Sequence, residues 1–169
     1  TYAEGVYVER RDGREAADRW WQNARRSVQK KGSLFRGEGS DSDQAYAPII
    51  YHKGAWVLHT LRHYVDDDLS WWKTLREFNL AFRYKNARTA DFRALLEKNT
   101  GRDWSQFFDQ WFMGSGYPKV EGKVTCDDQA IHVRVDNQGA GESTFHVPLD
   151  LAWFEQESER RQRVLLAPG

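Results

Sequence analysis

Cysteine is nearly absent from this chain, and several other features that would mark a particular class of protein are missing. Among 169 residues there is a single cysteine, Cys126, which excludes an internal disulfide framework and a cysteine-based zinc site. Basic and acidic side chains balance at 25 each, and we expect no nucleic-acid partner because phosphate neutralisation needs clustered Lys and Arg. No apolar run approaches the roughly 18 residues of a membrane span, so we expect no membrane partner either.

Aromatic side chains, by contrast, are abundant. The chain has 24 of them, which is 14% of its residues and enough to build a dense core despite 30% charged residues. This composition predicts a folded chain rather than a disordered one. The chain begins at Thr1 without a methionine and ends at Gly169, and we expect it to be a piece of a longer polypeptide.

The spacing of apolar residues changes near Tyr117, and this change predicts a mainly α fold with a β tail. Apolar residues recur at helical spacing before this point and alternate after it. We therefore predict a helical domain over residues 1–117 and a β domain over residues 118–169. The predicted helices cover residues 2–31 with a break at Asp12–Gly13, then 47–65, 69–83, 90–100 and 104–113. A Gly/Ser/Asp cluster at 37–43 predicts a surface loop.

Capping residues predict the starts of the last two helices. Thr89 is expected to be an N-cap, with Gly101 just past the end of that helix. Asp103, followed by Gln106 three residues later, has the spacing of a capping box, and Gly114 is expected to end the helix that follows.

In the tail, residues 130–136, 145–151 and 163–166 read as strands, and residues 137–141 read as the turn after the first of these. Pro148 within the second segment indicates an edge strand or a bulge. Three or four strands in about 50 residues form a poor core by themselves, so we expect an incomplete sheet.

Histidines recur along the helix predicted at 47–65. His52, Trp56, His59 and His63 share one helical stripe, and a His pair four residues apart can chelate a metal. However, Thr60 follows His59 where the H-E-x-x-H motif has its catalytic glutamate, and His52 lies about 10 Å from His59 along the axis. A polar, partly exposed helix face is therefore the favoured interpretation of this stripe.

Two tyrosines, Tyr46 and Tyr51, lie near the start of the same helix. A phenol can donate a hydrogen bond to an oxyanion while it stays neutral, which would make either residue a catalytic candidate. From the residues alone, the alternative of two core aromatics with satisfied hydroxyls is favoured. Gly54 would let another backbone approach Tyr51 closely.

Four segments, in order along residues 45–120, resemble those of aminopeptidase N-like zinc metallopeptidases, the gluzincin relatives of leukotriene hydrolase. Residues 51–62 resemble the family's Y-x-K-G-A-x-V-L-x-x-L-R, and residues 86–92 its N-A-x-T-x-D-F. Residues 97–108 match E-x-x-S/T-G-x-D-L-x-x-F-F, apart from Trp104 in place of the leucine. Trp111 and the later Gly-Tyr-Pro at 116–118 match W-x(n)-G-x-P. Any one segment is a weak match, but four in register make chance similarity hard to sustain.

The resemblance implies a fold and one catalytic residue. The chain would be the helical C-terminal subdomain of a thermolysin-like catalytic domain, followed by the first strands of a β-sandwich. Tyr51 matches the family's catalytic tyrosine, whose hydroxyl would stabilise the oxyanion formed during peptide hydrolysis. Tyr46 resembles, more loosely, a second active-site tyrosine, and Lys53 and Gly54 would be structural.

The resemblance also implies a zinc ion in the intact enzyme, with a peptide as its substrate. Glu4 could stand for the family's zinc-binding glutamate in one register, but the preferred register places that glutamate before Thr1. No H-E-x-x-H occurs in the chain. We therefore expect part of a zinc aminopeptidase that depends on the remainder of its parent polypeptide and is inactive and metal-free alone. The alternative is a non-catalytic helical scaffold or peptide-binding module derived from such an enzyme.

Overall fold

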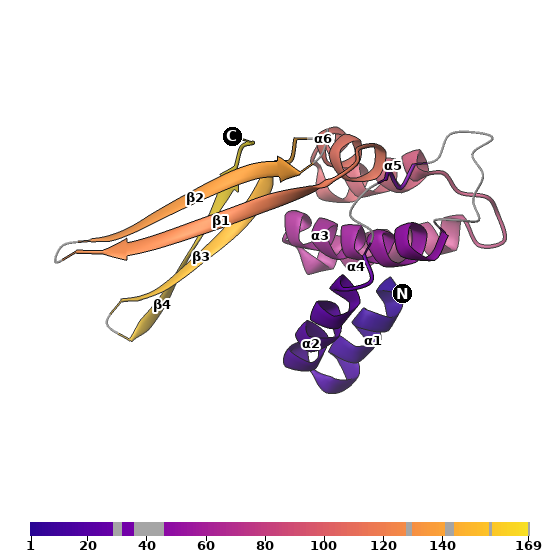
Figure 1. The fold of residues 1–169 in the computed structure, drawn as a ribbon. Helices are drawn as coiled ribbons and strands as arrows, with labels where there is room; N and C mark the ends of the chain where they lie inside the picture. The colour runs from indigo at the N-terminus through magenta and orange to yellow at the C-terminus, as the bar shows by residue number, and fades with distance from the viewer. Residues whose placement is uncertain (29–31, 36–45, 128–129, 141–143, 156, 169) are drawn as a thin grey trace. The chain divides into compact units, whose positions relative to one another are not determined.

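The computed structural model of the chain describes residues 1–28, 32–35, 46–127, 130–140, 144–155 and 157–168. It divides into two compact units, Thr1–Gly114 and Ser115–Gly169. The first is helical, and every strand in the described ranges lies in the second, which confirms the predicted mainly α fold with a β tail (Figure 1). The predicted loop at 37–43 lies outside the described residues.

The helical unit opens with two short helices, α1 (Tyr2–Asp12) and α2 (Arg14–Arg25). They are separated by Gly13, whose φ of 86° lies in the region that glycine adopts without steric cost, so the predicted break is confirmed. Gly5 on α1 is buried against α2, and a Cβ there would lie 2.5 Å from Cζ2 of Trp21. The close contact between these two helices therefore requires glycine at position 5.

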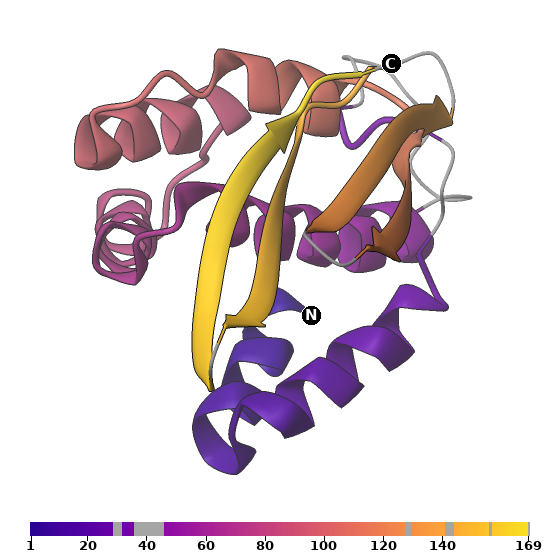
Figure 2. The ribbon, with the colours of Figure 1, turned by 90° about the vertical axis from the view of Figure 1, so that its left-hand side faces the viewer.

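The next two helices form the centre of the unit. A π-helical segment, η1 (Tyr46–Lys53), continues directly into α3 (Gly54–Val65), so the helix predicted at 47–65 is confirmed in extent. Asp66 takes a left-handed conformation with φ 54° and ends α3, and the Asp67 carboxylate then accepts backbone hydrogen bonds at the start of α4 (Asp68–Ala81). Figure 2 shows α3 lying between the α1–α2 pair on one side and the helices that follow α4 on the other.

Two further helices complete the unit, and their starts differ from the prediction by one residue. The N-cap of α5 (Thr89–Thr100) is Arg88, whose backbone N–H donates to Asp91 Oδ2 at 2.7 Å, and Gly101 ends it with φ 67°. The N-cap of α6 (Ser105–Phe108) is Trp104 and not Asp103, which instead accepts a hydrogen bond from the Ser105 N–H at 2.7 Å. A π-helical segment, η2 (Asp109–Met113), follows and ends at Gly114 as predicted.

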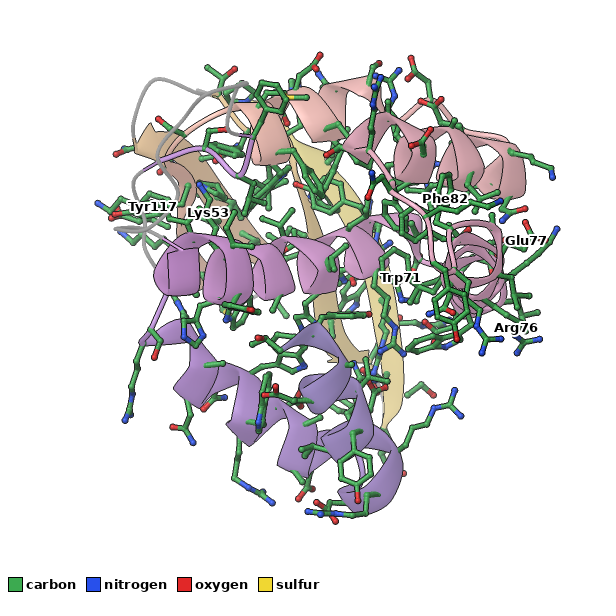
Figure 3. The ribbon with its side chains drawn as sticks, turned by 90° about the vertical axis from the view of Figure 1, so that its right-hand side faces the viewer. Lys53, Trp71, Arg76, Glu77, Phe82 and Tyr117 are labelled. Carbon is green, nitrogen blue, oxygen red and sulfur yellow. The ribbon has the colours of Figure 1, made fainter. Side chains whose placement is uncertain are left out.

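Aromatic residues from α3 to α6 build the main core. Trp71 and Leu61 are fully buried, and Figure 3 shows Trp71 on the α3 side of α4 whereas Arg76 projects from the opposite side. The other buried members of this cluster are Val57, Val65, Phe92, Leu96, Trp104, Phe107 and Phe108. A smaller cluster of Ala17, Trp21 and Ala55 joins α2 to α3. Burial of these large rings is the main stabilising contribution of the unit.

The second unit consists of two antiparallel hairpins. β1 (Tyr117–Cys126) pairs with β2 (Ile131–Ala140), and β3 (Val147–Glu155) pairs with β4 (Ser158–Leu166). The strands predicted at 130–136, 145–151 and 163–166 are found as β2, β3 and β4, but β2 and β3 end four residues later and β4 begins five residues earlier than predicted, and β1 was not predicted as a strand. Pro148 stands opposite Leu165 in a two-stranded sheet, where each strand is an edge, as its presence indicated.

The turn predicted at 137–141 is wrong for residues 137–140. These residues extend β2 and pair with residues 117–120 of β1. The reason is Asn137, which is buried and donates from Nδ2 to the carbonyl oxygens of Phe145 at 2.7 Å and Ala167 at 3.2 Å. The residue that reads as a turn former is thus held in a strand by long-range hydrogen bonds.

Candidate active site

Tyr51 lies in the π-helical segment η1 that precedes α3. A π turn inserts an extra residue into the helix, reorients the neighbouring side chains and is found frequently at functional sites. On either side of Tyr51, Ile49 and Lys53 are buried, and Lys53 Nζ donates to the Gly32 carbonyl oxygen at 2.5 Å. Tyr51 itself is 48% exposed, so the segment is anchored by its neighbours and presents the tyrosine.

Beside Tyr51 lies a cavity of about 490 Å³, here called the Tyr51 cavity. This volume is within the range of small-molecule sites. Its walls are mainly apolar and come from the start of α1, from η1, α3, α4, α5 and η2, and from Leu34, with Arg88 and Thr89 at the start of α5. The larger apolar side chains that line it are Leu34, Ile50, Leu58, Leu75, Phe78, Phe92 and Phe112. The arrangement can hold an apolar group next to a phenol.

Two other tyrosines of the helical unit show what a core tyrosine looks like here. The Tyr2 hydroxyl accepts a hydrogen bond from Trp71 Nε1 at 2.9 Å, and burial raises the pKa of Tyr2 to about 12. Burial also raises the pKa of Tyr64, which packs edge-on against Phe107. Both fit the interpretation of a core aromatic with an occupied hydroxyl. Tyr51 differs from them in its exposure, although Tyr2 lines the same cavity.

The predictions for the residues around Tyr51 have different outcomes. The polar contact of Lys53 is the Gly32 carbonyl, and burial lowers the pKa of this lysine. Gly54 permits no unusually close approach, since a Cβ there would meet Leu34 Cδ2 at an ordinary 3.7 Å. The backbone of Tyr46 begins η1, but its side chain lies outside the described part of the chain. Its expected role therefore stays a prediction.

The histidine stripe is part of a packed aromatic surface. The His59 ring stacks on Trp21 with a centroid distance of 4.1 Å and meets Trp56 edge-on at 5.5 Å. Burial, assisted by the charge of Arg62, lowers the pKa of His59 to about 4, so this ring is neutral at physiological pH. His63 is exposed, and His52 is partly buried. Within the described ranges, no three His, Cys, Asp or Glu side chains gather closely enough to hold a metal ion.

Sequence reasoning missed an ionic network beside this stripe. Arg62 donates to Glu9 at 2.6 Å and to Asp68 at 2.7 Å, and its guanidinium lies 4.8 Å from the centre of the Trp72 ring. Glu9, Arg62 and Asp68 border a second cavity, of about 560 Å³, lined by residues of α1, α2, α3 and the start of α4. Glu9 and Arg62 are 53 residues apart in sequence, and no local pattern signals such a pairing. The network joins α1 to α3 and α4.

Glu4, the zinc-ligand candidate of the less favoured register, lies on α1 with its side chain 68% exposed. It lines neither of the two cavities described above. A zinc ion, which the family resemblance implies, therefore does not fit the donors of the described residues.

The first of the four segments that resemble aminopeptidase N-like gluzincins contains Tyr51, which lies in η1 beside the Tyr51 cavity. Residues 10–111 match the peptidase family M1 domain, and the chain belongs to this family. It is 31% identical to aminopeptidase M1 of Arabidopsis thaliana and 27% identical to aminopeptidase M1-C of Oryza sativa subsp. japonica, each over 72% of this chain. It is 29% identical to aminopeptidase N of Lactococcus lactis subsp. lactis over 62% of this chain.

The matched region is small compared with these relatives. It spans 13% to 14% of their length. None of the helices within the described ranges is both long enough and apolar enough to cross a membrane.

Proposed function

We propose that this chain forms the tyrosine-bearing wall of the active site of a zinc aminopeptidase that removes N-terminal residues from peptides. The observation that carries the proposal is the presentation of Tyr51 by a π-helical segment at the Tyr51 cavity. Membership of the M1 family, whose relatives include several aminopeptidases, supports the peptide substrate.

The role proposed for Tyr51 is electrostatic. Attack of water on a peptide carbonyl places negative charge on the carbonyl oxygen, and a phenol held in place can donate a hydrogen bond to that oxygen. The zinc ion of the intact enzyme would supply the activated water. Its ligands would come from the remainder of the parent polypeptide, since no H-E-x-x-H is present in these 169 residues.

The test is Tyr51→Phe in the full-length parent polypeptide, assayed with aminoacyl amides. We expect the turnover rate to fall by roughly 10²–10³, equivalent to about 2.7–4 kcal/mol, because one oxyanion donor is lost. KM and zinc content should change little. Tyr84→Phe is a matched control, since Tyr84 is 92% exposed and does not line the Tyr51 cavity, and it should leave turnover unchanged. Tyr46→Phe should cost less than Tyr51→Phe. Normal turnover in Tyr51→Phe would show that Tyr51 is a half-exposed aromatic without a catalytic role.

A non-catalytic scaffold or peptide-binding module is the second candidate function. Zinc binding and hydrolysis by the full-length parent distinguish the two candidates. The full-length parent should bind stoichiometric zinc after dialysis and hydrolyse aminoacyl amides. The 169-residue chain alone should do neither, because a catalytic zinc needs three protein ligands. A full-length protein that binds peptides without hydrolysing them would favour the module.

A further inference from the structure

The Tyr51 cavity combines apolar walls with one cationic side chain. Among the described residues that line it, Arg88 has the only ionised side chain. The remaining lining side chains are apolar or carry hydroxyl groups. A cavity of this kind is complementary to a ligand with an apolar body and a single anionic group, because the apolar walls cannot compensate a second charge.

Arg88 is available for such a ligand. Its side chain is exposed, and within the described ranges it forms no ion pair. The neighbouring carboxylate, Asp91, accepts the backbone N–H of Arg88 at 2.7 Å. By contrast, Arg62 is paired with Glu9 and Asp68. An anion that binds Arg88 therefore breaks no existing ion pair.

The position of Arg88 at the start of α5 also favours ligand binding. Arg88 is the N-cap of α5, so its backbone is fixed by the helix that starts at the next residue. That helix contributes Phe92, one turn further on, to the wall of the same cavity. Arg88 and Phe92 are thus carried by the same helix, which fixes the spacing of their backbones at the cavity.

We propose that Arg88 determines substrate specificity by pairing with a carboxylate of the peptide whose apolar side chain occupies the Tyr51 cavity. This inference rests on the proposed function. The carboxylate is either the C-terminus of a short peptide or an acidic side chain, and both have the planar pair of oxygens that a guanidinium binds with two parallel hydrogen bonds.

The experiment uses the full-length parent polypeptide and three substrates. Leu-Leu has a C-terminal carboxylate, Leu-Leu-NH₂ has none, and Leu-Glu-Leu-NH₂ has only an acidic side chain. We expect Arg88→Gln to lower kcat/KM about tenfold for one or both carboxylate substrates, mainly through KM, and to change it less than twofold for Leu-Leu-NH₂. Arg88→Lys should retain part of the preference, because it keeps the charge and loses the two-pronged geometry.

Arg83→Gln is the matched control. Arg83 is an exposed arginine five residues earlier that does not line the cavity, and its removal should leave all three substrates unaffected. Equal effects of Arg88→Gln on all three substrates, or no effect on any, would overturn the inference.

Failure of the proposed function gives a different result. In that case Leu-Leu-NH₂ would not be hydrolysed even by the unmodified protein, and the inference is then tested by titration calorimetry with Leu-Leu and with Leu-Glu-Leu-NH₂. Binding weakened about tenfold in Arg88→Gln and unchanged in Arg83→Gln would support the carboxylate site without catalysis. Binding that is absent, or equal in both variants, would overturn it.

Discussion

The two units of this chain use their apolar residues differently. In the helical unit, large side chains such as Trp71, Phe108 and Leu61 are removed from solvent almost completely. In the β unit, β1 is exposed along nearly its whole length, and Val124 and Val133 are 63% and 44% exposed. Phe145 is the one large aromatic buried there among the described residues.

The difference teaches that periodicity and burial are separate properties. Helical spacing in the first unit places apolar stripes of several helices against one another, and a shared core results. Alternation in the second unit produces strands. In a two-stranded sheet, however, each strand has only one neighbouring strand, and its apolar side chains find little surface to pack against. We therefore expect core substitutions to be costly in the helical unit and inexpensive in the hairpins.

The largest expected effect is that of Leu61→Ala. Leu61 has no exposed surface and lies in the main core, so the substitution should lower the free energy of unfolding by about 2–5 kcal/mol. Leu69→Ala, at an 85% exposed position, should cost less than about 0.5 kcal/mol. Urea unfolding followed by circular dichroism measures both. The contrast between the two units would be wrong if Val124→Ala in β1 lowered the free energy of unfolding as much as Leu61→Ala does.

The next effect concerns the contact between α1 and α2. Gly5→Ala should destabilise the helical unit by about 1–3 kcal/mol, because its Cβ would lie 2.5 and 2.8 Å from atoms of the Trp21 ring. Gly54→Ala is the matched control, since its Cβ meets only ordinary contacts and it gains about 0.5–1 kcal/mol of helix propensity. Thermal unfolding measures whether each variant has a lower or a higher melting temperature than the unmodified chain. Equal melting temperatures would contradict the close contact at Gly5.

A smaller effect is expected in the β unit, where Asn137 links the two hairpins. Asn137→Ala should cost about 1–2 kcal/mol, because the carbonyl oxygens of Phe145 and Ala167 lose their side-chain donor. It should also increase amide hydrogen exchange in residues 144–155. Gln138→Ala, at an exposed neighbour, should have no measurable effect. If Asn137→Ala leaves exchange unchanged, the β unit is held together by something other than this amide.

The last expected effect depends on pH. Burial lowers the pKa of His59 to about 4, below the usual value of about 6.5 in an unfolded chain. Between these two values the unfolded state binds one proton more than the folded state, so stability should fall as the pH falls from about 6.5 to about 4. His59→Phe keeps a ring beside Trp21 without a titrating group, and its melting temperature should decline less over this window. Leu69→Ala should follow the unmodified chain, and an identical slope in His59→Phe would exclude His59 as the cause.

Much of the helical unit was predictable from local pattern. The break at Gly13, the continuous helix before Asp66 and the stop at Gly101 all follow from residues whose backbone preferences are strong. The caps of α5 and α6 differ from the prediction by one residue: Asp91 accepts the backbone N–H of Arg88, and Asp103 accepts that of Ser105. The strand β1 was missed because Pro118 and Gly122 interrupt its alternation.

The candidate site was predictable in identity but not in geometry. Tyr51 was found through the family segment, whereas the π turn that presents it has no local sequence signature. His59 read as a polar surface residue, yet it stacks on Trp21, which lies 38 positions away on another helix. Arg88 carried no site prediction, because nothing local indicates that it borders a cavity.

By itself, the sequence determined the elements of this protein: helices before residue 117, strands after it, and a tyrosine at the start of α3. These features depend on spacing along the chain and on the preferences of single residues, which a sequence states directly. Only the tertiary structure decided that Asn137 lies in a strand, that His59 is neutral and that Tyr51 and Arg88 line one cavity. Each of these outcomes depends on groups distant in sequence, whose burial and mutual approach exist only once the chain has folded.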